Sequence, residues 1–479
     1  MSHPHVSHAT ALRDRVPLVQ KVAFGLGMAT PIAFGNALAQ LTNLIFNIGL
    51  GINPILLGAA QMIPRFWDAI SDPLAGFLSD NTRTRWGRRK PYVLLGGLAT
   101  GVCFGAIWHV SPDLGPKGIL LFYLATTLLF YTAVTIYTVP LQALGFEMTR
   151  DYHERTRLFA YASFIGNVFA VLTPWMYWLA RREAFFANEV EGMKVVGSGV
   201  GVLIMGMAVF CGVKCQERYY DEIQRQPRVK LWSSLKDVMR SRAFLRLLGC
   251  VFLVTAGYSF VNGFANYIII YYVFGGARSA ASTVMGINGT AWAITALIAV
   301  FPMTWWSRRF GKASTVRLAV VAMMAGNLLK VVCYNPAYPL LTLIPTVLIS
   351  SGMLMLYTMG PAMVADVCNE DELVHGVRRE GCFSSMYSWW LKFAGSSALL
   401  VAGVLLVSTR FNHEVEQQTR FTLFWLRTFE ISIPTLLCAG GLVFMIRYPL
   451  TEEQAYENKQ RLEARREPAA VPAGGGTGA

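Results

Sequence analysis

The chain has 479 residues, of which 54% are hydrophobic and 15% are charged, and its formal net charge is +14. A soluble domain carries more charge and lacks repeated apolar runs of about 20 residues. The composition therefore excludes an ordinary soluble protein and predicts an all-α membrane protein.

Twelve apolar segments follow one another along the sequence. Most are long enough to cross about 30 Å of hydrocarbon as a helix that rises 1.5 Å per residue. We expect membrane-spanning helices near residues 21–50, 54–79, 91–110, 118–146, 157–180, 195–213, 247–274, 282–306, 314–334, 339–365, 382–408 and 424–446.

The basic residues are distributed unevenly between alternate loops. If the N-terminus is cytoplasmic, 31 of the 42 Lys and Arg residues fall on the cytoplasmic side and 8 on the outer side. Because cytoplasmic loops of membrane proteins carry such an excess, both termini are expected in the cytoplasm. The positive charge therefore indicates orientation and gives no reason to expect a nucleic-acid partner. The first 20 residues lack the apolar core of a cleavable signal peptide, and we expect a location in a bacterial inner membrane.

The longest polar stretch divides the twelve segments into six and six. Within it, Leu231, Leu235, Val238 and Met239 recur at helical spacing, which predicts a short amphipathic helix on the membrane surface. The expected organisation is a cytoplasmic tail (1–20), an N-terminal half (21–213), a middle loop (214–246), a C-terminal half (247–447) and a partly disordered cytoplasmic tail (448–479).

The two halves repeat each other weakly. A basic turn follows the second segment at Arg88 and Arg89, and another follows the eighth segment at Arg308 and Arg309. Paired six-helix halves with matching cytoplasmic loops are typical of the major-facilitator fold. When the cytoplasmic side closes, the basic loop after the second segment is expected to contact acidic loop residues. The predicted cytoplasmic gate comprises Asp80, Arg85, Arg88, Arg89, Glu147, Asp151, Asp366, Glu372 and Arg378.

The second segment holds charges deep within an apolar span. Gln61, Arg65, Asp68 and Asp72 fall within about 60° of one another on a helix, so they share one face. Each charge costs a few kcal/mol at the bilayer centre unless it is paired or hydrated, so this face is expected to line an interior cavity. Two carboxylates one turn apart repel each other and favour the uptake of a cation or a proton. A structural ion pair between Arg65 and one aspartate is the alternative interpretation.

Uncharged polar residues form further stripes. The first segment carries one at i, i+4, i+7 and i+11, the fourth carries one around Thr138, and the seventh carries one around Asn262. Amides and hydroxyls both donate and accept hydrogen bonds, as the hydroxyl groups of a sugar require. The alternative is hydrogen bonding between packed helices. These stripes consist of Asn36, Gln40, Asn43 and Asn47; Tyr131, Thr135, Thr138 and Gln142; and Tyr258, Asn262 and Asn266.

The eleventh segment carries Trp389 and a lysine, Lys392, within the membrane. A lone intramembrane lysine needs a partner or a cavity, so we expect a functional role for Lys392. Sugar sites often stack a ring on an aromatic side chain, and packing at the interface is the alternative for Trp389. Lys330, near the outer end of the ninth segment, is expected to extend its ammonium toward the interface.

These motifs resemble the glycoside–pentoside–hexuronide:cation symporter family of the major facilitator superfamily. The string R-F-W-D-A-I-S-D-P from Arg65, followed by R-W-G-R-R-K-P-Y from Arg85, is similar to the family signature. The loop from Val364 to Glu380 is similar as well. The resemblance extends over most of the chain in helix order and implies twelve helices and cation-coupled symport.

The resemblance also implies site residues. A cation site is implied at Asp68, Ser71, Asp72 and Thr135, with Lys392 between it and the substrate. Tyr357 falls at a position that the family uses for the sugar. The galactoside-binding positions are not retained, since Ile32, Thr138, Ser163 and Gln142 stand there, which argues against a galactoside. The predicted substrate residues are Asn36, Gln40, Asn43, Arg65, Thr138, Gln142, Asn262, Tyr357, Trp389 and Lys392.

The expected function is symport of a sugar, glycoside or uronate with Na⁺ or H⁺ by alternating access, and Li⁺ is a further candidate for the coupling cation. Transport of an amphiphile such as a lysolipid and a transport-inactive nutrient sensor are the alternatives. The sequence offers no nucleophile–base arrangement and no H-E-x-x-H motif, so an enzyme is not expected. Apart from the coupling cation, no metal or cofactor is expected. The expected partners are a small-molecule substrate, a monovalent cation and the lipid bilayer, and the protein is expected to be a monomer.

Overall fold

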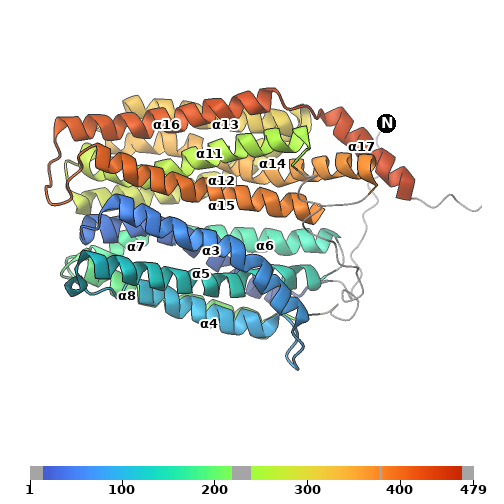
Figure 1. Ribbon diagram of the computed structural model, residues 1–479, viewed down its shortest axis with the longest axis horizontal. Coiled ribbons are helices and arrows are strands. Elements are labelled where there is room, and N and C mark those ends of the chain that lie inside the picture. The colour runs from blue at the N-terminus through green and yellow to red at the C-terminus, as the bar shows by residue number, and fades with distance from the viewer. Residues whose placement is uncertain (1–14, 150–151, 218–238, 377–379, 467–479) are drawn as a thin grey trace, which may run out of the picture.

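The computed structural model describes residues 15–149, 152–217, 239–376 and 380–466. Helices run side by side along the long axis of the molecule, and the described residues contain no strand (Figure 1). The N-terminal half comprises α1 (Leu18–Ala29), η2 (Thr30–Phe34), α2 (Gly35–Thr42), η3 (Asn43–Gly49), α3 (Pro54–Asn81), α4 (Lys90–Ile107), η4 (Pro112–Leu114), α5 (Gly115–Glu147), α6 (Tyr152–Ala170), α7 (Leu172–Ala180) and α8 (Glu189–Lys214). The C-terminal half comprises α11 (Arg242–Tyr267), η5 (Ile268–Val273), α12 (Arg278–Phe310), α13 (Lys312–Cys333), η6 (Pro339–Thr342), α14 (Leu343–His375), α15 (Glu380–Ser408) and α16 (Arg420–Ile446), and α17 (Glu452–Arg466) follows.

All twelve predicted segments are helical. Ten helices of the described ranges are long and apolar enough to cross a membrane. The other two segments depart from a regular apolar helix for visible reasons. The first is divided by the π-helical turns η2 and η3, and η2 contains Pro31, which has no amide hydrogen to donate. The second, α3, carries Arg65, Asp68 and Asp72 along its middle.

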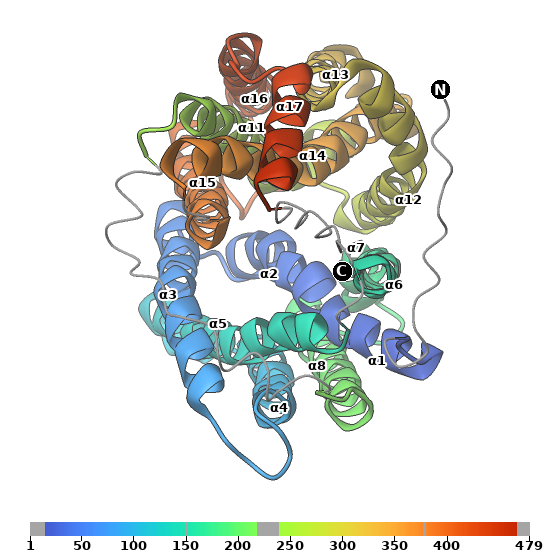
Figure 2. The ribbon, with the colours of Figure 1, turned by 90° about the vertical axis from the view of Figure 1, so that its right-hand side faces the viewer.

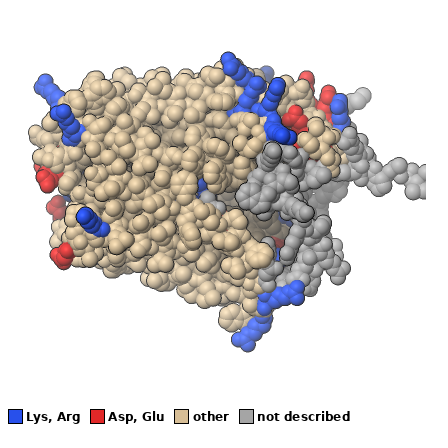
Figure 3. Space-filling view, viewed as in Figure 1, with Lys and Arg blue, Asp and Glu red and all other residues tan. Residues whose placement is uncertain are grey.

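The halves form two groups of helices. In Figure 2, α1–α8 lie in the lower group and α11–α17 in the upper group. On the face shown in Figure 3, charged side chains gather toward the two ends of the molecule and leave a broad uncharged band between them. Such a band is expected for a surface that contacts lipid.

Local sequence explains several element boundaries. The Asn53 side chain accepts hydrogen bonds from the amides of Ile55 and Leu56, and Pro54 occupies the first position of α3. Gly311 joins α12 to α13 with φ of +82°, a conformation that favours glycine. The helices α4 and α8 pack closely because Gly101 and Gly201 face each other, and a Cβ on either would lie 2.4 Å from a backbone oxygen of the other.

The buried apolar side chains show where the halves meet. One cluster joins both halves and includes Phe46 of the N-terminal half and Tyr267 of the C-terminal half. At the predicted cytoplasmic end, each half has a separate cluster, around Phe24 in one and Phe383 in the other. Tyr267 donates a hydrogen bond to Asn47 across the shared region, with 2.7 Å between oxygens. The two halves are therefore packed together at the predicted outer end.

Two predictions concern the polar segments. The amphipathic helix predicted around Leu231 and Leu235 lies in 218–238, outside the described residues. In the tail, α17 is a regular helix that packs against α14, and the disorder predicted for the end of the tail remains a prediction. Residues 467–479 lie outside the described chain.

Candidate cation site and substrate cavity

A charged cluster joins the two halves in the middle of the molecule. Asp68 and Asp72 lie one turn apart on α3, and the ammonium of Lys392 on α15 lies between them. Its Nζ is 2.7 Å from Asp68 Oδ2 and 2.5 Å from Asp72 Oδ2. The side chains of Lys392, Asp72 and Asp68 are 33%, 35% and 15% exposed, so the cluster is only partly shielded.

Two hydroxyl groups complete this cluster. Thr135 on α5 donates a hydrogen bond to Asp68 Oδ1, with 2.7 Å between oxygens. Ser71 Oγ lies 3.1 Å from Thr135 Oγ1, and both residues are buried. The structure thus brings together the four residues predicted for the cation, and their carboxylate and hydroxyl oxygens are of the type that binds a small hard cation.

The counter-ion of the aspartates is Lys392 and not Arg65. The alternative interpretation of an ion pair between Arg65 and an aspartate is wrong for this structure, in which no described carboxylate pairs with Arg65. A Cβ added to Gly395, on α15, would lie 3.9 Å from Arg65 Nη1, so Arg65 lies beside α15. The sequence showed that Arg65 shares a face with the aspartates but could not show that a lysine 320 positions from Asp72 would reach them.

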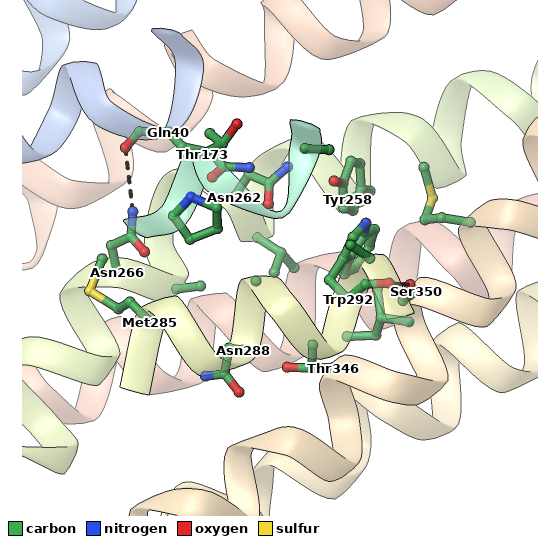
Figure 4. Close-up of a pocket in the computed structure, with 18 of the residues that line it drawn as sticks. Gln40, Thr173, Tyr258, Asn262, Asn266, Met285, Asn288, Trp292, Thr346 and Ser350 are labelled. Atoms are coloured by element: carbon green, nitrogen blue, oxygen red, sulfur yellow. Dashed lines mark hydrogen bonds between the residues drawn. The ribbon is translucent and has the colours of Figure 1, made fainter. Parts of the chain in front are cut away.

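A cavity of about 400 Å³ lies between the halves and is lined by helices other than α3, α5 and α15, which carry this cluster. Its walls come from α2, α6 and α7 of one half and from α11–α14 of the other. Figure 4 shows Gln40, Asn262 and Asn266 on one side, and the amide of Asn266 reaches the backbone oxygen of Gln40 at 3.5 Å. Tyr258 and Trp292 stack with ring centroids 5.2 Å apart. The amide-bearing wall residues are Gln40, Asn167, Asn262, Asn266 and Asn288.

Only some of the predicted substrate residues line this cavity. Gln40, Asn262 and Tyr357 line the cavity, whereas Asn43, Arg65, Thr138, Gln142, Trp389 and Lys392 are not among its wall residues. Asn43 instead accepts a hydrogen bond from Gln61 at 3.0 Å, which is a contact between the first and second helices. Gln142 is exposed. Asn36 lies on α2, and its side chain is outside the described part of the structure.

Other predicted substrate residues have different surroundings. Trp389 is 39% exposed and stacks on Phe393 with ring centroids 5.4 Å apart. Thr138 has a buried hydroxyl with no hydrogen-bond partner in the described chain. Gln40 and Tyr357 therefore line this cavity without Thr138, Trp389 or Lys392, and one substrate site shared by all of them remains a prediction.

Sequence reasoning missed part of the wall. Asn288 and Trp292 of α12 both line the cavity. Their spacing of four residues was a usable signal, because it places an amide and an indole on one face of an apolar helix. Trp292 packs on Tyr258, which the sequence had already placed in a polar stripe.

Several of the predicted gate residues make contacts within their own halves. Glu147 accepts hydrogen bonds from Arg88 and Arg89, all in the N-terminal half. Lys312 pairs with Asp366 at 2.7 Å in the C-terminal half. Arg85 lies over the ring of Trp86. The Asp80 side chain, Asp151 and Arg378 lie outside the described parts of the chain, and the predicted contact of these loops across the halves remains a prediction.

The loop after α3 has a further acidic partner that was not predicted. The carboxylate of Glu217 accepts hydrogen bonds from the backbone amides of Arg88, Arg89 and Lys90, at 2.7–3.0 Å. It caps the start of α4 and holds this basic loop against the end of α8. Gly87, with φ of +105°, passes close to the same carboxylate, where a side chain would not fit.

An ion-pair network at the predicted outer end joins the halves. Glu189 pairs with Arg181 of its own half and with Arg278 of the other half, whose Nη1 lies 3.0 Å from Glu189 Oε1. Arg278 also donates to the backbone oxygen of His413 at 3.4 Å. The sequence predicted these residues only as charges of outer loops.

Lys330 contradicts the expectation for its side chain. It is 3% exposed and pairs with the fully buried Glu430 of α16, with 2.7 Å between Nζ and Oε1. Tyr334 donates to the same oxygen at 2.9 Å. Because the carboxylate lies within reach inside the bundle, the lysine does not extend toward the membrane surface.

Comparison with known proteins identifies the family of this chain and several relatives. The family model for "MFS/sugar transport protein" matches residues 23–452. The "Sodium-dependent lysophosphatidylcholine symporter 1" of Gallus gallus is 24% identical over 95% of this chain and 91% of its own length. The "Putative glycoside/cation symporter" of Escherichia coli is 23% identical over 91% of this chain and 93% of its own.

A solved structure, that of a D-xylose-proton symporter, superposes with a TM-score of 0.66 at 13% identity, over 91% of this chain and 98% of the other. At that identity, the likeness concerns the fold alone. The fold predicted from the paired halves and the family resemblance drawn from the α3 motif are both confirmed. The protein is a multi-pass membrane protein of the major-facilitator fold, and the chain belongs to the MFS/sugar transport protein family.

Proposed function

We propose that this protein is a cation-coupled symporter whose cation, Na⁺ or H⁺, binds at Asp68, Asp72, Ser71 and Thr135. The observation that carries the proposal is the ammonium of Lys392 between the two carboxylates. Two carboxylates one turn apart repel each other, so a positive charge between them is strongly favoured. A monovalent cation that replaces the ammonium would meet the same carboxylates and the hydroxyls of Thr135 and Ser71.

Displacement of Lys392 connects the cation to the movement of the halves. Asp68 and Asp72 belong to the N-terminal half and Lys392 to the C-terminal half, so their ion pair crosses the interface that opens and closes. A bound cation releases Lys392 and thereby changes the relative energies of the two states. Coupling requires that cation and substrate each raise the affinity for the other by the same factor.

The proposed substrate is a glycoside or a related polyhydroxylated solute. Five carboxamides and the stacked pair of Tyr258 and Trp292 line a cavity whose volume suits a small ligand. Carboxamides can match both the donors and the acceptors of hydroxyl groups, and an aromatic face can cover the apolar face of a sugar ring. The family description and the name of the Escherichia coli relative support this class.

A lysophospholipid is the second candidate substrate. Leu41 and Leu44 of the first helix and Ile269 and Met285 of the other half form an apolar part of the cavity wall, which could receive an acyl chain. The name of the Gallus gallus relative supports this class. The apolar wall lies toward the predicted outer end and the stacked Tyr258 and Trp292 lie further inward.

Uptake into proteoliposomes tests the proposed function. The purified protein would be given radiolabelled glycosides, uronates and a lysophospholipid, with an inward Na⁺ gradient, an inward H⁺ gradient or neither. We expect accumulation of one class above equilibrium with one gradient, and only equilibration without it. Equal uptake in all three conditions would contradict cation coupling, and the class that accumulates decides between the two candidates.

A further inference from the structure

The outer end of the cavity contains a charged group that the cation site does not use. Lys330 and Tyr334 both line the cavity, and both donate to Oε1 of Glu430, at 2.7 and 2.9 Å. Lys330 is 3% exposed and Glu430 is fully buried. A lysine buried to this degree in a membrane protein needs either complete pairing or a functional ligand.

The pairing of Lys330 is incomplete. An ammonium has three donors, and the described residues supply one acceptor for it, Glu430 Oε1. The other oxygen of Glu430, Oε2, is buried without a hydrogen-bond partner in the described chain. Buried polar groups are nearly always satisfied, so unused donors beside a cavity indicate a place where a ligand binds.

The charges around the pair favour an anion. Arg427 lies one turn from Glu430 on α16, and its guanidinium donates to the hydroxyl of Tyr272 at 2.7 Å and to the backbone oxygen of Val331. Lys330, Arg427 and Glu430 together carry one net positive charge. An added monoanion brings this group to neutrality, whereas an added cation would double its charge.

We propose that Lys330 and Tyr334 form a subsite for an anionic group of the substrate, either the carboxylate of a uronate or the phosphodiester of a lysophospholipid. This inference rests on the proposed function, because it places the group within the same cavity. Lys330 has donors that Glu430 does not use, and the Tyr334 hydroxyl, which now donates to Glu430, would turn its one hydrogen toward the bound anion. The amides of Asn262 and Asn288 would then contact the uncharged part of the substrate.

Matched pairs of probes test the subsite by binding to the purified protein, read from the change in tryptophan fluorescence. One pair is methyl β-glucuronide and methyl β-glucoside, which differ in the carboxylate. The other pair is a lysophosphatidylcholine and the monoacylglycerol with the same acyl chain, which differ in the headgroup phosphate. We expect the anionic member of one pair to bind about tenfold more tightly than its neutral partner, as for a hydrogen bond to a charged group.

The double variant Lys330→Met/Glu430→Gln removes both charges and keeps the volume of the pair. It should bind the anionic and neutral members equally, while its affinity for the neutral member stays within about twofold of wild type. Tyr334→Phe removes one donor and no charge, and it should reduce the preference about threefold, which keeps the test decisive if the double variant does not fold. The matched control is Lys21→Met/Glu154→Gln, another largely buried pair at 2.6 Å that lies at the predicted cytoplasmic end, and it should keep the full preference.

The outcomes separate this inference from the proposed function. If glucoside or monoacylglycerol binds and is accumulated but the anion is not preferred, the subsite is wrong and the symporter stands. An anion preference that persists in both the double variant and Tyr334→Phe also overturns the subsite. If no probe binds or is transported under any gradient, both proposals fail.

Discussion

Lys392 and Lys330 lie inside membrane-spanning helices of the C-terminal half, and they are paired in opposite ways. Lys392 bridges two carboxylates of the other half, and its side chain is 33% exposed. Lys330 pairs with Glu430 of its own half, and both side chains are buried. In the proposed alternating-access cycle, the first pair breaks and re-forms as the halves move, whereas the second stays within one half. Only the Lys392 ion pair can therefore couple binding in one half to the position of the other half.

The difference in burial predicts that the Lys330–Glu430 pair contributes more to the free energy of unfolding than the Lys392 cluster does. Glu430→Gln leaves the Lys330 charge buried without its partner, and breaking a buried pair in this way costs about 3–5 kcal/mol. The double variant with Lys330→Met should recover most of this loss. Thermal unfolding in detergent would show it, with Lys392→Met as the comparison because that lysine is partly exposed. Similar midpoints for Glu430→Gln and wild type would contradict the assigned ion pair.

The carboxylates of the Lys392 cluster should control accumulation. A membrane potential of 100 mV supplies about 2.3 kcal/mol per charge, or roughly fifty-fold accumulation for one coupled cation. Asp72→Asn and Asp68→Asn should each reduce accumulation to equilibration, while substrate exchange without a gradient survives in at least one of them. Uptake and exchange in proteoliposomes measure both properties. Normal cation-stimulated accumulation in both variants would refute the assignment of the cation site.

Lys392→Met should have the opposite effect to the aspartate variants, because it should strengthen cation binding. If the ammonium competes with the cation, its removal should lower the cation concentration for half-maximal binding by about tenfold, since the two carboxylates then lack a counter-ion. A Na⁺ titration followed by tryptophan fluorescence, repeated at two pH values, measures this change. An unchanged or weaker cation affinity would show that Lys392 supports the cation site rather than competing for it.

The smallest expected effect concerns the outer network. Glu189→Gln weakens the contact with Arg278 across the halves, and we expect a few-fold increase in the outward-open population, about 1 kcal/mol for a charged hydrogen bond that is partly screened. A cysteine in place of Gln40, in the cavity, should then react faster with an impermeant thiol reagent added from the outside. The neighbouring, exposed Glu191→Gln is the control and should leave the reaction rate unchanged.

The sequence predicted the arrangement of helices well because each span must satisfy its own backbone and carry its own apolar surface. Asp68 and Asp72 were predicted because charges within an apolar helix are costly, so their presence is informative. Ser71 and Thr135 were added to the predicted cation site by the family resemblance. The residues that line the cavity were predicted less well from the sequence. Asn43 and Asn262 look alike in a helical stripe, and only packing decides that one binds Gln61 and the other lines the cavity.

Partners distant in the sequence could not be predicted from the residues alone. Nothing in the helix that carries Lys330 indicates that Glu430, 100 positions later, reaches it. The same holds for Glu189 and Arg278, which belong to different halves and were visible only as loop charges. Periodicity gives the face of a helix, but the neighbour of that face depends on the packing of the whole bundle.

The π-helical turns have a consequence for how the outer end can open. The first helix ends in η3 (Asn43–Gly49) and the seventh ends in η5 (Ile268–Val273), so the same irregularity occurs at equivalent places of the two repeats. The widened turns meet each other, since Asn47 of one binds Tyr267 beside the other. A π-turn weakens the regular backbone ladder, and helices bend preferentially where the ladder is interrupted. In the proposed transport cycle, the predicted outer side would therefore open by bending of these two helix ends away from each other, while the rest of each bundle keeps its shape.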